Sequence, residues 1–213
     1  MRFIFSSLFL MLFLMGCSSP KTSYYRMSSS PIAATPAANG NVRIMVGPVN
    51  VPASLDRPQL VTQSGATEVQ VHEYHRWAGT LKGDIGQVIV SRLAQDLGTS
   101  DVWSFSQSTQ AQFDYQILID VQNFNSAEKG DVALDVLWTI KPSPQTVSTG
   151  LSKSNSNPST NVQCKGRALT GRSVVNETLV GSGFDALVAA QSRAFSKVSD
   201  DIAKRFTGEG CRP

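Results

Sequence analysis

The sequence predicts a single α/β domain, with α+β as the alternative, in which two long helices pack on a mixed, largely antiparallel sheet. Residues 113–121 and 132–140 alternate apolar and polar side chains, whereas residues 81–97 and 184–206 repeat apolar side chains at helical spacing. Strands, helix, strands and helix follow one another in a chain of 213 residues, a length that suits one domain. We expect this domain to occupy residues 42–213.

Residues 1–16 are predicted to be a lipoprotein signal peptide. Arg2 precedes an apolar run, residues 3–15, that is shorter than the roughly 20 residues a membrane-spanning helix needs. The run ends in "LMGC", which resembles the bacterial lipobox, so Cys17 is expected to carry a thioether-linked diacylglycerol. Ser18 stands where an aspartate would retain a lipoprotein in the inner membrane, which favours the outer membrane. The alternative is an ordinary signal peptide with an incidental cysteine.

Residues 17–41 are predicted to form a flexible tether. The segment is rich in Ser, Pro, Ala, Thr and Asn and has almost no apolar periodicity. Fully extended, it would span on the order of 80 Å, and as a random coil about 25 to 30 Å. Folding is expected to begin near Val42, with a half-buried strand that Gly47 and Pro48 end.

The remaining elements follow from local patterns. Two short β-prone runs, 59–63 and 68–72, flank Ser64 and Gly65 and predict a hairpin. For the helix over 81–97, Thr80 is the expected N-cap and Gly98 the expected C-terminal left-handed residue. Further elements are two long strands joined by a turn at 125–131, a polar low-complexity loop over 142–160, a strand resuming near 161, and the terminal helix.

Charge and cysteine content narrow the functional classes. The formal net charge is +3, and basic and acidic residues are interspersed, so no clustered basic surface for nucleic acid is indicated. Once Cys17 is lipidated, Cys164 and Cys211 remain in a compartment that oxidises thiols. We expect these two cysteines to form a disulfide. The alternative is two unpaired cysteines, one buried and one exposed near the C-terminus.

Candidate catalytic residues are few. His72 and His75 are three apart in a segment that looks extended, which is not the zinc-protease spacing, and no G-x-S-x-G elbow is present. We therefore predict a protein that is not an enzyme and has no metal or cofactor. Asp114, Asp120 and Asp135 alternate along neighbouring strands. A lipid-anchored hydrolase is kept as an alternative in case two of them meet in a pocket, and a direct lipid carrier in case the domain holds a deep apolar cavity.

An interaction surface is indicated by a group of residue types that anchor protein interfaces. Arg57, Tyr74, Arg76 and Trp77 are concentrated in the part of the chain least like a regular core. We interpret them as candidate partner-binding residues. The alternative is that Trp77 fills the core beneath the helix and the arginines are solvated.

Several stretches resemble one known family. "GCSSPKTSYYRM", "VGPVNVPASLDRPQLVTQSG", "HRWAGTLKGDIGQVIVSRLAQDLGT" and "LVAAQSRAFSKVSDDIAKRF" are similar, in order, to the ABC-type transport auxiliary lipoprotein family. The resemblance implies a fold like that of the TolB N-terminal domain. It also implies a non-catalytic lipoprotein that works beside an MCE-domain protein and an inner-membrane permease in the transport of lipids or other hydrophobic molecules. Association with further copies of the chain is left open. The polar loop over 142–160 departs from the family pattern.

Overall fold

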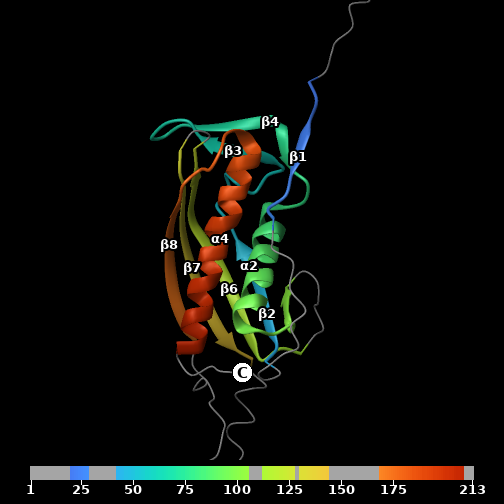
Figure 1. The fold of residues 1–213 in the computed structure, drawn as a ribbon, viewed down its shortest axis with the longest axis vertical. Helices are drawn as coiled ribbons and strands as arrows, with labels where there is room; N and C mark the ends of the chain where they lie inside the picture. The colour runs from blue at the N-terminus through green and yellow to red at the C-terminus, as the bar shows by residue number, and fades with distance from the viewer. Residues whose placement is uncertain (1–19, 29–41, 106–111, 128–129, 144–167, 209–213) are drawn as a thin grey trace, which may run out of the picture.

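A computed structural model describes residues 20–28, 42–105, 112–127, 130–143 and 168–208, and these ranges form one α/β domain (Figure 1). The single-domain α/β prediction with two long helices is confirmed. The described elements are, in chain order, β1 (Ser23–Tyr25), β2 (Ile44–Asn50), β3 (Gln59–Gln63), β4 (Val69–Trp77), α2 (Leu81–Leu97), β5 (Val102–Ser104), β6 (Tyr115–Ser126), β7 (Val132–Pro142), β8 (Leu169–Glu177) and α4 (Gly183–Gly208).

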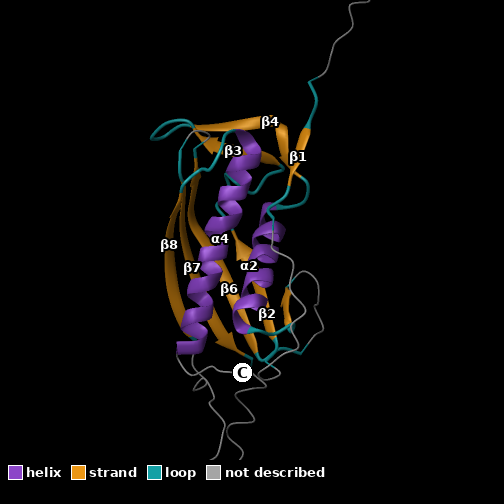
Figure 2. Ribbon diagram, in the orientation of Figure 1, coloured by secondary structure: helices purple, strands orange, loops and turns teal. Residues whose placement is uncertain are grey.

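The strands form two sheets rather than the one expected from the sequence. The larger sheet has the order β5-β2-β6-β7-β8, with β2 parallel to β5 and β6, and with β7 antiparallel to β6 and β8. The smaller sheet has the order β1-β4-β3. Both helices lie on the same face of the larger sheet, and the smaller sheet lies across the end of the domain at which α4 begins (Figures 1 and 2).

Helix α2 begins and ends where its capping residues predict. The Gly83 N–H donates a hydrogen bond to Thr80 Oγ1 at 3.1 Å, which satisfies one of the free donors of the first turn. Gly98 follows the helix in the left-handed region at φ 63°, and its N–H donates to carbonyl oxygens of the last turn. Both ends of α2 were therefore predicted correctly from single capping residues, Thr80 and Gly98.

Strand β6 shows how a bulge changes which residues are buried. Tyr115 and Val121 lie in the predicted buried phase, but the pairing with β7 shifts between Val121 and Asn123. Beyond this bulge the phase inverts, and Phe124 and Ser126 are the buried residues. The predicted strand pair is confirmed.

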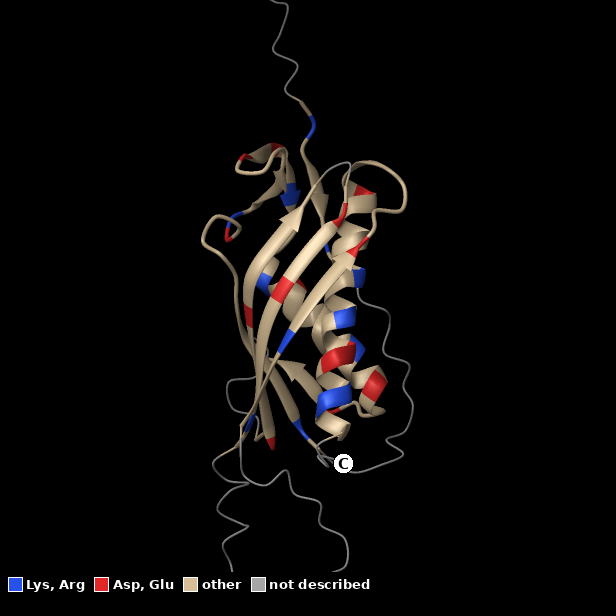
Figure 3. Cartoon of the chain, turned by 90° about the vertical axis from the view of Figure 1, so that its left-hand side faces the viewer, with Lys and Arg blue, Asp and Glu red and all other residues tan. Residues whose placement is uncertain are grey.

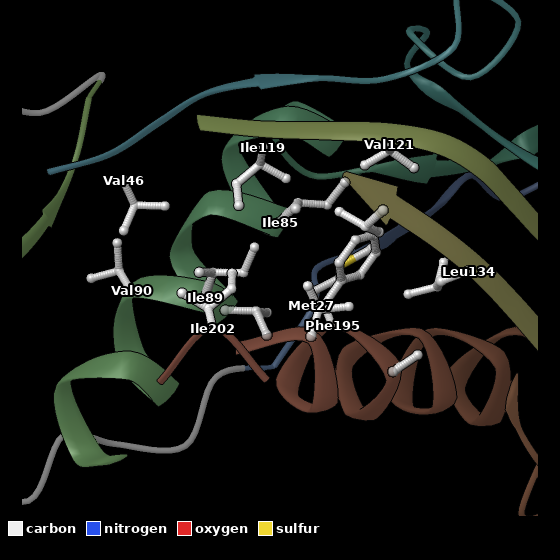
Figure 4. Close-up of a cluster of buried hydrophobic side chains, with 14 of the residues drawn as sticks. Met27, Val46, Ile85, Ile89, Val90, Ile119, Val121, Leu134, Phe195 and Ile202 are labelled. Atoms are coloured by element: carbon white, nitrogen blue, oxygen red, sulfur yellow. The ribbon is translucent and has the colours of Figure 1, made fainter. Parts of the chain in front are cut away.

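The core fills the space between the two helices and the larger sheet. Figure 4 shows side chains of α2, α4 and the strands meeting in one cluster. Met27 belongs to the same cluster, although it precedes the first strand of the larger sheet by many residues, and it is only 3% exposed. Residues from both ends of the described chain therefore contribute to one core.

The expected boundary of the tether near Val42 needs correction. Residues 20–28 contain β1, which pairs in parallel with β4 in the register Tyr24↔Arg76, and the buried Met27. Strand pairing uses backbone groups, so a three-residue strand needs no apolar alternation to form. For this reason a prediction based on composition placed this segment outside the fold. Residues 17–19 and 29–41 lie outside the described ranges.

Two further differences concern short or irregular strands. Strand β2 continues through Gly47 and Pro48 to Asn50, because the pairing with β6 is irregular between Val46 and Val49 and leaves the proline out of the regular ladder. Strand β5 was not predicted. The predicted loop over 142–160 and the start of its following strand lie almost wholly outside the described residues, and β8 begins at Leu169.

Candidate functional site

The inner face of the small sheet is held to α4 by an aromatic cluster. Tyr25 and His75 share a hydrogen bond of 2.9 Å between the phenol oxygen and Nδ1, and the His75 ring stacks on Phe184 with centroids 3.9 Å apart. His72 meets the same Phe184 edge-on at 4.6 Å and shares a hydrogen bond of 2.7 Å with Thr62 Oγ1. The two histidines thus attach the sheet to the start of α4.

The arrangement of these histidines does not indicate a metal centre. Within the described ranges, no group of three or more His, Cys, Asp or Glu residues is placed to hold a metal ion. The ring contacts of His72 and His75 are those of packing residues at the junction of two elements.

The outer face of the small sheet carries exposed aromatic side chains. Successive residues of a strand point to opposite faces, so Tyr24 and Arg76 lie on the face opposite Tyr25 and His75. Tyr24 is 65% exposed and Tyr74 is 48% exposed. Arg76 lies between Tyr24 of β1 and Gln59 of β3, and its Nε is covered, with no hydrogen-bond partner among the described residues. Tyr74 precedes it by two residues, in the part of β4 where the pairing with β3 is irregular. We call Tyr24, Tyr74 and Arg76 the outer tyrosine face.

The structure separates the four predicted partner-binding residues. Tyr74 and Arg76 lie on β4, and Arg57 is exposed in the turn that precedes β3. Trp77 is only 5% exposed and belongs to the core cluster, so the structure gives it the core role and its side chain is not available to a partner. Tyr24 was missed by sequence reasoning because it lies in the segment that composition assigned to the tether.

The three aspartates considered for hydrolysis do not converge. Asp114 pairs with Arg43 at 3.0 Å just before β6 begins, whereas Asp135 pairs with Arg172 of β8 beside the far half of β6. Burial raises the pKa of Asp114, but the hydrogen bonds and charge of Arg43 outweigh it and leave this pKa below its usual range. The hydrogen bond from Arg172 likewise lowers the pKa of Asp135. Both carboxylates are therefore ionised partners of arginines, and Asp120 is exposed.

A depression of about 260 Å³ lies between the helices, but its chemistry is polar. Arg92 Nε donates to Asp200 Oδ1 at 2.6 Å and lies 3.2 Å from Asp96 Oδ1. Burial and a hydrogen bond with Asp200 raise the pKa of Asp96. One arginine thus bridges a carboxylate from each helix, which joins α2 to α4. A depression with this charged lining is not the deep apolar cavity expected of a lipid carrier; it is lined by Arg92, Asp96, Asp200, Ala203, Lys204 and Thr207.

Charge over the described surface is mixed. Figure 3 shows basic and acidic residues of α4 following one another along the helix, with scattered charges on the neighbouring strands. Glu177 accepts ion pairs from Arg193 and Lys197, both at 2.6 Å, which joins the end of β8 to α4. None of the helices in the described ranges is both long enough and apolar enough to cross a membrane.

Comparison with known families decides the assignment. The sequence profile described as "ABC-type transport auxiliary lipoprotein component" matches residues 25–203, from β1 to the last third of α4. The chain belongs to this family. The match of this ABC-type transport auxiliary lipoprotein family begins at Tyr25, so it includes part of the N-terminal segment that the structure places in the fold.

Solved structures support the same fold. An uncharacterized protein of known crystal structure is 16% identical, with a TM-score of 0.63 over 88% of this chain and 99% of that chain. Protein XCC0632 from Xanthomonas campestris, of the family DUF330, is 14% identical, with a TM-score of 0.64 over 89% of this chain and 97% of that one. The comparison with curated proteins finds no match. At these identities the likeness establishes a shared fold.

Proposed function

We propose that this chain is a non-catalytic accessory component of an MCE-type transport system that moves lipids or other hydrophobic compounds between the two bacterial membranes. The observation that carries this proposal is the family match over residues 25–203, which describes a lipoprotein component of ABC-type transport. The geometry supports a binding role, because Asp114 and Asp135 are engaged in separate ion pairs and both histidines are packing residues. An MCE-domain protein and an inner-membrane permease are the proposed partners.

We place the protein on the periplasmic face of the outer membrane, held by lipid on Cys17. The proposal is supported by the apolar run at residues 3–15, the "LMGC" sequence and Ser18 after the cysteine. Two or three acyl chains on the new N-terminus would hold it stably, since a single chain binds a membrane only marginally. The family description as a lipoprotein agrees with this anchor.

Crosslinking in intact cell envelopes, followed by identification of the proteins that co-purify with this chain, tests the proposal. We expect an MCE-domain protein and a permease among the crosslinked products of the native protein. A Cys17→Ala variant should lose acyl labelling and these crosslinks together, because no other residue can form the thioether. Val174→Ser, on the exposed face of β8, is the matched control and should change neither. Recovery of cell-wall material without any transport component would overturn the adaptor function in favour of the hydrolase.

A further inference from the structure

The distance between the anchor and the fold is short. Strand β1 begins at Ser23, six residues after Cys17, so even a fully extended chain holds it within about 20 Å of the lipidated residue. A tether reaching to Val42 would have allowed on the order of 80 Å. The lipid anchor therefore keeps one end of the domain near the membrane.

The residues that follow Ser23 do not lengthen this link, because they are fixed to three parts of the domain. The Ala78 N–H donates to the Tyr25 carbonyl at 2.7 Å, directly after β4. The Met27 N–H donates to Asp84 Oδ2 of α2 at 3.2 Å, and the Ser28 N–H donates to Ser192 Oγ of α4 at 3.1 Å. With the Met27 side chain buried in the core, releasing this segment would break several contacts at once.

The end of the domain that receives β1 is the one that carries the outer tyrosine face. Figure 1 shows β1 entering beside β4 at the end where α4 begins, and α4 then leads away over 26 residues, or about 39 Å. Tyrosine is enriched at membrane interfaces, where the ring contacts apolar groups and the hydroxyl stays hydrated. Lys21 and Arg26, both exposed, flank β1 and can meet phosphate groups. Acidic Glu73 is exposed nearby, so the tyrosines and the short link, rather than net charge, favour this contact.

We propose that the outer tyrosine face, Tyr24, Tyr74 and Arg76, rests on the phospholipid headgroups of the membrane that holds Cys17. The opposite end of the domain then points into the periplasm. This orientation assigns Tyr74 and Arg76 to the membrane instead of the protein partner suggested by the sequence. It rests on the proposed anchoring through Cys17.

Photo-crosslinking of the full-length, lipidated protein in intact envelopes tests this contact. The variants are Tyr24→p-benzoylphenylalanine and Tyr74→p-benzoylphenylalanine, and Thr170→p-benzoylphenylalanine is the control, because Thr170 is exposed near the far end of β8. Thermal melts establish that each variant is folded. We expect phospholipid adducts, detected by mass, at positions 24 and 74 and none at 170. Adducts to a protein at 24 and 74, or equal lipid adducts at all three positions, would overturn the proposal.

A pair of insertions tests the short link separately. Eight Gly/Ser residues placed between Ser19 and Pro20 should lower the lipid adduct at position 74 several-fold, because a longer link lowers the effective concentration of the face at the membrane. The same insertion between Asn39 and Gly40 should leave the adduct unchanged, because the fixed residues 20–28 lie between it and the anchor. Equal effects of the two insertions would contradict the short link. Acyl labelling, measured in parallel, separates a failure of anchoring from a failure of this contact alone.

Discussion

The backbone N–H of Met27 donates a hydrogen bond to Asp84 Oδ2 at 3.2 Å and so joins the N-terminal segment to the first turn of α2. Burial raises the pKa of Asp84, while this hydrogen bond and the charge of Arg26 act in the opposite direction. The carboxylate is also well placed near the positive end of the helix dipole. The contact lies beside the buried Met27 side chain, so segment and helix are linked by both polar and apolar interactions.

Met27→Ala should destabilise the domain by about 2 to 4 kcal/mol, because it removes a buried side chain from the core cluster that Met27 shares with α2, α4 and the strands. Limited proteolysis of the variant should also release residues 20–28 earlier than in the parent. Urea unfolding and mass analysis of the first cleavage products measure the two effects. Arg26→Ala, at the exposed neighbouring position, is the control. Identical unfolding of the two variants would mean that Met27 does not hold this segment.

Trp77→Ala is expected to lower the stability of the domain, whereas Arg57→Ala is expected to weaken the contact with the transport partner. The first removes a large core side chain and is expected to cost about 3 to 5 kcal/mol of unfolding free energy. The second changes an exposed turn residue and should leave the melting temperature almost unchanged while weakening crosslinking to the transport partner. Thermal melts and envelope crosslinking of each single variant decide this. A strong loss of stability in Arg57→Ala would remove the reason to consider it an interface residue.

Gly171→Ala should be strongly destabilising. Gly171 is paired with Trp138 across β7 and β8, and a Cβ at this position would lie 2.2 Å from Cζ2 of the indole ring. The ring is 4% exposed and its Nε1 donates to Ser173 Oγ at 3.1 Å, so moving it also breaks a buried hydrogen bond. We expect a loss of about 1 to 3 kcal/mol or more. Thr170→Ala, at the exposed neighbour, should stay within about 0.5 kcal/mol of the parent in urea unfolding.

Glu177→Gln should lose stability in a pH-dependent manner. Burial raises the pKa of Glu177, but the hydrogen bonds and charges of Lys197 and Arg193 lower it more, so the folded-state pKa lies below its usual value. A lowered pKa means that the ionised carboxyl stabilises the fold above the unfolded value of about 4.3, and that this contribution is lost as the pH falls through the folded value. We expect a deficit of about 2 kcal/mol at pH 7 that fades at acid pH. A deficit that is equal at pH 7 and pH 3 would show that packing, not charge, is responsible.

Cys164 and Cys211, which lie outside the described residues, are predicted to form a disulfide in exported protein. The bridge would close a long loop, from before β8 to beyond α4, and a chain-entropy estimate gives about 4 kcal/mol for a loop of this size. Thiol blocking of unreduced protein followed by mass analysis should find neither cysteine alkylated. Reduction should lower the melting temperature. Two alkylated cysteines in natively exported material would rule out the bridge.

The amino-acid sequence by itself determined the elements whose information is local. The helix over Leu81–Leu97 was predicted with its Thr80 and Gly98 caps, because capping depends on one residue and its nearest backbone groups. The pair formed by β6 and β7 was predicted because alternating apolar and polar residues indicate directly which side chains of a strand are buried. The lipidation of Cys17 is likewise a prediction from a short linear pattern, and it awaits its test.

The tertiary structure decided the features that depend on partners distant in the chain. Strand β1 forms because β4 offers free backbone groups beside it, and Met27 is buried because the two helices leave a space that it fills; neither fact leaves a local pattern in a polar segment. Trp77 and Tyr74 belong to the same strand and look alike in sequence, yet one lies in the core and the other is exposed. Which face of β4 meets α4 is set by packing over the whole domain, and only the assembled fold contains that information.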